Sequence, residues 1–122
     1  MPGAVRVRFA GEAGADAGLD RDVATQIYRI GQEAVSNALR HANPTRVELA
    51  LMRDASVLVF RVSNDGKEFR SAGENSGLGR RSMSYRAALI GAHLTIGSGA
   101  TGGALVEVRV DIAGSAKPAV DA

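Results

Sequence analysis

The 122-residue sequence has no cysteine and no tryptophan, and only 4% of its residues are aromatic. Without cysteine it can form no disulfide, no thiolate metal site and no cysteine nucleophile. No apolar run approaches the ~20 residues that a membrane-spanning helix needs, and the first residues do not begin a signal peptide. The sequence therefore predicts a soluble piece of protein that is compatible with a cytoplasmic setting.

An excess of charge of one sign is also missing. Fifteen Lys and Arg residues oppose 13 Asp and Glu residues, which leaves a formal net charge of +2. The few aromatic-bearing segments do not interleave with a basic patch, so we expect no dedicated nucleic-acid surface. At this length one core is expected, in a domain over residues 1–112. Residues 113–122 mix Gly, Ser, Pro and Ala without periodicity, which predicts a flexible tail.

Glycine is the one residue in excess, with 15 copies against about 8 or 9 expected from its usual share. A residue without Cβ suits turns and places where the backbone approaches a ligand closely. For the glycines of 97–103 we favour ordinary hairpin turns. The cluster in the second half comprises Gly66, Gly73, Gly77, Gly79, Gly97, Gly99, Gly102 and Gly103.

Hydrophobic periodicity predicts the order of the elements. Ala4–Phe9 alternates apolar and charged residues, which is typical of a half-buried edge strand. Asp20 is a suitable N-cap for a helix that runs to about His41 and stops at Asn43-Pro44. The later elements are strands Val47–Leu51 and Val57–Val62 joined by the turn Arg53–Ser56, a helix Leu78–Gly91, and a hairpin of His93–Ser98 with Leu105–Ile112.

Strands that pair as hairpins, with helices able to cover only one face, predict an α/β (α+β) two-layer sandwich. The sheet is expected to be mixed and mostly antiparallel, and not a doubly wound parallel sheet.

The first helix combines two stripes. Because residues four apart share a helical face, Glu33, Asn37 and His41 are expected to form one polar stripe. Such a stripe alone is typical of a solvated helix. The apolar stripe beside it comprises Val23, Ile27, Ile30, Ala34 and Ala38.

Two glycine-bearing loops follow this helix: Asn64-Asp65-Gly66 after an apolar strand, and Gly77-Leu78-Gly79 at the start of the second helix. With this order, the segments YRIGQEAVSNALRHA, NDGKEF, SGLGRRSMSYRAALIGAHLTI and GGALVEVRV resemble the ATP-binding catalytic domain of two-component sensor histidine kinases, in the GHKL superfamily. The likeness covers about Ala4 to Ile112 and is greatest to the subfamily that includes the nitrate sensors.

The resemblance implies binding of ATP with Mg²⁺ between the helix layer and a lid loop drawn from about Arg70 to Ser76. The γ-phosphate would pass to a histidine on a separate dimerisation domain of the same kinase, and from there to a response regulator. Neither His41 nor His93 lies on a predicted dimerisation helix, so we expect the chain alone not to phosphorylate itself. His93 is expected to be structural, and no membrane contact is expected from this fragment.

By the same resemblance Asn37 is the metal ligand, and an amide oxygen is a competent ligand for Mg²⁺. Glu33 matches the catalytic acidic residue that helps to activate the incoming nucleophile as a general base. Arg40 and His41 stand where the family places basic residues near the phosphates. Alternatively, Arg40 is merely exposed and His41 interacts with the helix C-terminus.

The second motif departs twice from the family pattern. Asn64 stands where an Asp accepts a hydrogen bond from the adenine amino group, and Glu68 replaces a glycine. Loss of the charge-assisted bond should cost on the order of 1 kcal/mol. Asp65 could act as a substitute acceptor, or it could belong to a simple N-D-G turn with Gly66.

The third motif, Gly77-Leu78-Gly79, opens a helix, where unpaired N–H groups and the dipole favour phosphate. Arg80 adds positive charge in this first turn, where the family often has Leu, and an adjacent anion would make that charge favourable.

Two alternatives remain: a degenerate nucleotide-binding regulatory domain, which Asn64 and Glu68 favour, and an anti-sigma-factor-type serine kinase of the same superfamily. A gyrase-like or chaperone-like ATPase is less expected, because the sequence shows no transducer domain.

Overall fold

A computed structural model describes residues 5–12, 14–15, 18–66, 77–99 and 102–112. The chain forms five strands and two α-helices in this part, with a π-helical turn at the end of the first helix. In chain order they are β1 (Arg6–Gly11), α1 (Arg21–Asn37), the π-helical turn (Ala38–Ala42), β2 (Arg46–Asp54), β3 (Val57–Asn64), α2 (Gly77–Leu89), β4 (His93–Ser98) and β5 (Ala104–Asp111).

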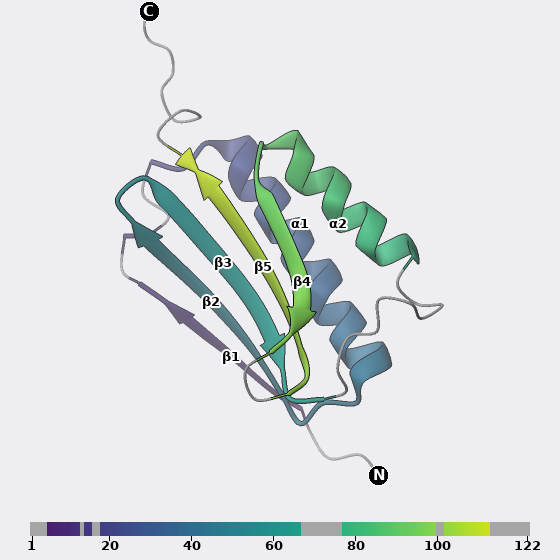
Figure 1. Ribbon diagram of the computed structural model, residues 1–122. Coiled ribbons are helices and arrows are strands. Elements are labelled where there is room, and N and C mark those ends of the chain that lie inside the picture. The colour runs from purple at the N-terminus through teal and green to yellow at the C-terminus, as the bar shows by residue number, and fades with distance from the viewer. Residues whose placement is uncertain (1–4, 13, 16–17, 67–76, 100–101, 113–122) are drawn as a thin grey trace, which may run out of the picture.

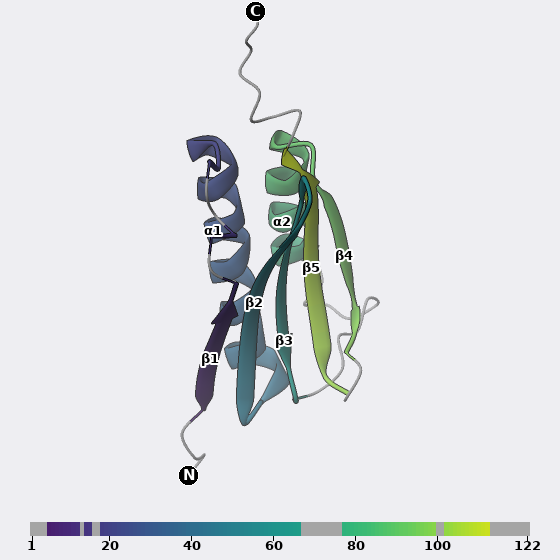
Figure 2. The same cartoon turned by 90° about the vertical axis from the view of Figure 1, so that its left-hand side faces the viewer.

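The strands form one sheet in the order β1-β2-β3-β5-β4. β1 runs parallel to β2, and every other neighbouring pair is antiparallel. Both helices lie on the same face of this sheet, as the two views show (Figure 1, Figure 2). The expected mixed, mostly antiparallel sheet under one helical layer is therefore confirmed.

The core lies between the two helices and the central strands. Period-two alternation turns one row of apolar side chains from β3 and β5 toward the helices, where they are buried. The expected apolar stripe of α1 is buried against them, as are Met83 and Ala87 of α2. The buried sheet residues of this row are Leu58, Phe60, Val62, Val106, Val108 and Val110.

Helix α1 begins as the sequence predicts, because the Asp20 carboxylate accepts the N–H of Asp22 at 3.0 Å. The helical backbone also stops where the sequence predicts, before Asn43-Pro44, but the geometry of its last turn differs from the expectation. After Asn37 the backbone continues as a π-helical turn and ends at Asn43, which has a left-handed φ of 51°. A π turn holds more residues than an α turn, so His41 does not follow Asn37 at the α-helical spacing that a single polar stripe requires.

The first strand is also a correction. It spans Arg6–Gly11 instead of Ala4–Phe9, and all six of its residues are exposed instead of half-buried. It is the edge strand that was expected, but α1 does not cover its apolar side chains. As a result Val7 is 58% exposed and Phe9 is 61% exposed.

Most of the other boundaries move by a few residues. β2 and β3 extend beyond their apolar runs and leave a turn at Ala55, whose φ is 56°. α2 starts at Gly77 and ends at Leu89, instead of at Leu78 and Gly91. The expected tail at 113–122 lies outside the described residues.

The packing of the sheet on the helices predicts that a Leu→Ala substitution lowers the free energy of unfolding far more in the core than on the surface. Leu58 is 0% exposed and Leu89 is 53% exposed. Leu58→Ala should lower the free energy of unfolding by about 2 to 5 kcal/mol, because it leaves a cavity in the core. Leu89→Ala should change it by less than about 0.5 kcal/mol. Urea unfolding followed by circular dichroism measures both, and equal losses would contradict this assignment of the core.

Candidate functional site

The two helices are antiparallel neighbours, and this arrangement brings two of the predicted motifs together. Arg86, near the end of α2, donates from Nη1 to Oε1 of Gln26, near the start of α1, at 3.1 Å. The end of α1 therefore lies beside the start of α2 (Figure 1). Glu33 and Asn37 follow Gln26 by seven and eleven residues, a spacing that keeps all three on the flank of α1 toward α2. Both side chains are half-buried there.

The start of α2 is formed by Gly77, Leu78 and Gly79, as the third motif predicts. The first N–H groups of a helix have no partner within it, and together with the helix dipole they favour an anion. Arg80 is half-buried in the same first turn. A phosphate at this helix end would therefore meet backbone donors and lie near a cation.

The second motif forms a tight turn at the end of β3. Oδ1 of Asn64 accepts the N–H of Gly66 at 2.7 Å, so the side chain of Asn64 closes an Asx turn. Neither Gly66 nor Gly103 leaves room for a side chain. A Cβ on Gly66 would overlap the carbonyl oxygen of Ala42, and one on Gly103 would overlap that of Asn64. Three connections of the chain are therefore packed backbone to backbone at this end of the sheet.

Asp65 ties the same turn to the start of β2. Its Oδ1 accepts the N–H groups of Thr45 at 2.8 Å and Arg46 at 2.9 Å, and its Oδ2 accepts the hydroxyl of Thr45. The Thr45 hydroxyl, followed by the Arg46 N–H, lowers the pKa of the Asp65 carboxyl from 3.8 to about 2. These bonds favour the structural turn over the use of Asp65 as a substitute adenine acceptor. Sequence reasoning missed Thr45, because no local pattern links it to a residue 20 positions away.

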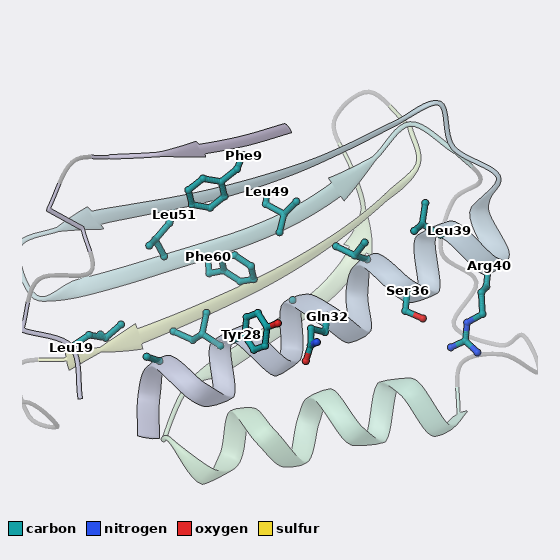
Figure 3. Close-up of a pocket in the computed structure, with 14 residues that line it drawn as sticks. Phe9, Leu19, Tyr28, Gln32, Ser36, Leu39, Arg40, Leu49, Leu51 and Phe60 are labelled. Carbon is teal, nitrogen blue, oxygen red and sulfur yellow. The ribbon is translucent and has the colours of Figure 1, made fainter. Parts of the chain in front are cut away.

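The other predicted residues are more scattered. His41 is exposed in the π-helical turn. Arg40 is exposed in the same turn, at one end of an apolar groove between α1 and strands β1 and β2, and its side chain points away from the strands (Figure 3). Glu68 and the expected lid Arg70–Ser76 lie outside the described residues.

Within the described ranges, no group of three or more His, Asp and Glu side chains is placed to hold a metal ion. A magnesium ion at Asn37 would therefore take most of its ligands from phosphate and water oxygens. Mg²⁺ is commonly bound in this way in nucleotide sites.

No helix in the part of the chain that the structure describes is long and apolar enough to cross a membrane.

The lowered pKa of Asp65 predicts an acid-sensitive stability. A carboxyl group whose pKa is lowered by folding stabilises the fold at pH values above its ordinary pKa. This contribution is lost as the pH falls from about 4 to about 2. Asp65→Asn should therefore be less stable than the parent near neutral pH, and the difference should shrink over that interval. Thr45→Val removes the hydroxyl but keeps the N–H, so it should show a smaller loss of stability with the same dependence on pH. Urea unfolding at several pH values measures this, and a difference that does not change with pH would contradict it.

No protein-family model matches the sequence. The curated relatives include Sensor protein VraS of Staphylococcus haemolyticus, Staphylococcus epidermidis and Staphylococcus aureus. Each is 33% identical over 93 residues, which cover 75% of this chain and 27% of the relative. The chain thus spans about a quarter of the length of these relatives.

Solved structures share the fold. The blue-light activated histidine kinase EL346 of Erythrobacter litoralis matches with a TM-score of 0.75 at 23% identity, over 89% of this chain and 36% of that one. The ATP binding domain of PrrB from Mycobacterium tuberculosis matches with a TM-score of 0.61 at 19% identity, over 71% and 67%. The chain is therefore a homologue of sensor histidine kinases, and it has the fold of their ATP-binding domain.

Proposed function

We propose that this chain is the ATP-binding catalytic domain of a sensor histidine kinase, in the group that includes the nitrate sensors. It binds Mg-ATP and donates the γ-phosphate to a histidine on a separate dimerisation domain, from which a response regulator receives it. The observation that supports this most is the antiparallel contact of α1 and α2, which sets the Glu33 and Asn37 flank beside the glycine-rich start of α2. A cytoplasmic setting is part of the same proposal.

Each residue at the junction of α1 and α2 has a separate role in this proposal. The amide oxygen of Asn37 holds Mg²⁺, which neutralises phosphate charge when bound. The N–H groups of the Gly77–Gly79 turn, with Arg80 close by, receive phosphate oxygens. Glu33 is half-buried on the same flank and takes the proton of the incoming nucleophile. Such a site works by positioning groups and stabilising charge, and forms no covalent bond to the protein.

Asn64 and Gly66 hold the adenine base in this proposal. Oδ1 of Asn64 already accepts the Gly66 N–H, and an amide oxygen has a second lone pair for the adenine amino group. Gly66 lies directly against Ala42 in the π-helical turn that follows Asn37, so the adenine loop adjoins the metal-binding end of α1.

A second candidate is a degenerate domain that binds nucleotide weakly and regulates a partner. The engaged oxygen of Asn64 favours it, because only part of its accepting capacity remains for a base. An anti-sigma-factor-type serine kinase would have the same nucleotide site. The residue that becomes phosphorylated on a protein partner, Ser or His, distinguishes it from the first proposal.

Removal of the metal ligand tests the site directly. Asn37→Ala should abolish the magnesium dependence of ADP and ATP binding, because the protein then supplies no oxygen to the ion. Gln32→Ala is the matched control, since it removes an exposed amide from the same helix but outside the flank that carries Glu33 and Asn37. Isothermal titration with and without magnesium measures both variants. If Asn37→Ala binds nucleotide as the parent does in both conditions, the assignment of the metal ligand is wrong.

Restoration of the family pattern separates a working domain from a degenerate one. Asn64→Asp keeps one oxygen for the Gly66 N–H and offers a charged second oxygen to adenine, and Glu68→Gly removes a carboxylate near the expected nucleotide. Together they should tighten ATP binding by roughly 1 to 3 kcal/mol, or about 5- to 150-fold. Titration of the folded double variant measures the change. Unchanged or weaker binding would mean that this loop does not hold the base in the proposed way.

A further inference from the structure

The side-chain amide of Asn64 is held in one orientation. Its Oδ1 accepts the N–H of Gly66 at 2.7 Å. Because an N–H group needs an acceptor, the atom that faces Gly66 is the amide oxygen, and the nitrogen lies at the other end of the amide. Nδ2 carries the N–H donors and takes no part in this turn. Asn64 therefore presents donors beside an oxygen whose accepting capacity is only partly used.

The place of Asn64 in the sheet turns this amide toward the helices. Asn64 is the last residue of β3, two residues after Val62, and it lies opposite Val47 of β2. Val47 and Val62 are 0% and 3% exposed beneath the helical layer. Because residues two apart on a strand share a face, the half-buried side chain of Asn64 projects from the helix-covered face. The proposed nucleotide site, formed by α1 and α2, lies on this face (Figure 1).

Backbone on two sides keeps the amide in place. A Cβ on Gly103 would lie 3.2 Å from Oδ1 of Asn64, so the backbone before β5 packs closely beside the amide. On the other side, Gly66 packs against the backbone of Ala42. The orientation of the amide is therefore maintained by main-chain contacts as well as by its own hydrogen bond.

The neighbouring carboxylate does not replace Asn64 as a contact for the base. Oδ1 of Asp65 accepts the N–H groups of Thr45 at 2.8 Å and Arg46 at 2.9 Å, and Oδ2 accepts the hydroxyl of Thr45. Both oxygens are therefore turned toward the start of β2. In the described part of this turn, the amide of Asn64 is the side-chain group that remains to contact a base.

An amide and a carboxylate distinguish purines in different ways. Adenine has an amino group at its 6-position, which donates, whereas a 6-oxopurine such as hypoxanthine has a carbonyl oxygen there, which accepts. A carboxylate offers acceptors alone, so it matches the amino group and repels the carbonyl oxygen. The amide of Asn64 offers both kinds of group, because Oδ1 keeps a lone pair for the amino group and Nδ2 can donate to the carbonyl oxygen.

We propose that Asn64 widens the base specificity of the site, so that it binds 6-oxopurine nucleotides as well as ATP. This inference rests on the proposed function, because it requires the base to lie at Asn64. An acidic residue at this position would face the carbonyl oxygen of a 6-oxopurine with another acceptor, and Asn64 removes that repulsion. Asn37 and the start of α2 act on magnesium and phosphate, which both kinds of nucleotide share.

Three triphosphates that differ at the 6-position test the proposal. ATP has an amino group there, ITP has a carbonyl oxygen, and purine riboside triphosphate has only hydrogen. Isothermal titration with magnesium should give dissociation constants for ATP and ITP that agree within about threefold, both clearly below that of purine riboside triphosphate. ITP bound no more tightly than purine riboside triphosphate, with ATP bound more tightly than either, would overturn this inference alone. Binding of none of the three would overturn the proposed function with it.

Two substitutions of Asn by Asp provide the matched variants. Asn64→Asp keeps the shape of the side chain and an acceptor for the Gly66 N–H, but it removes the donors. It should weaken ITP binding relative to ATP binding by at least about tenfold. Asn43→Asp adds the same charge at an exposed position after the π-helical turn, and should leave the ratio of the two affinities unchanged. An unchanged ratio in folded Asn64→Asp, or an equal shift in both variants, would overturn the proposal.

Discussion

The burial of one stripe of α1 against the centre of the sheet determines how the rest of the molecule is used. Ile30 and Leu58 are each 0% exposed, so the rotation of the helix about its axis is determined by packing. That rotation turns Glu33 and Asn37 toward α2, and it turns Tyr28 and Leu39 toward the open side of β1. One helix therefore separates the proposed nucleotide junction from the apolar groove.

A second constraint acts at the end of the sheet where the motifs meet. Gly66 packs on Ala42, Gly103 packs on Asn64, and Asp65 accepts three hydrogen bonds from Thr45 and Arg46. The π-helical turn after α1, the turn after β3 and the turn before β5 are thereby held together. In the proposed function this packed end holds the Asn64–Gly66 loop in a constant position relative to Asn37, as phosphoryl transfer by positioning would require.

Local patterns in the sequence predicted much of this fold. The spacing of Val23, Ile27, Ile30 and Ala34 predicted both a helix and its buried face, and apolar runs separated by turn residues predicted four of the strands closely. Alternation in the first strand predicted half-burial, and this was wrong because periodicity does not show whether a helix reaches an edge strand. The residues of the site were proposed from motifs, but the role of Asp65 depends on its hydrogen bonds to Thr45, and the groove depends on how α1 lies over β1 and β2. Such features come from tertiary contacts between residues far apart in the sequence.

The central claim is that nucleotide binds between the end of α1 and the start of α2. An NMR titration of the ¹⁵N-labelled chain with Mg-ADP tests it most directly. Amide shifts should change most around Glu33 to Ala42, Asn64 to Gly66 and the first turn of α2, while those of Phe9 and Leu51 in the groove stay constant. Changes centred on the groove, or none at saturating nucleotide, would contradict the account.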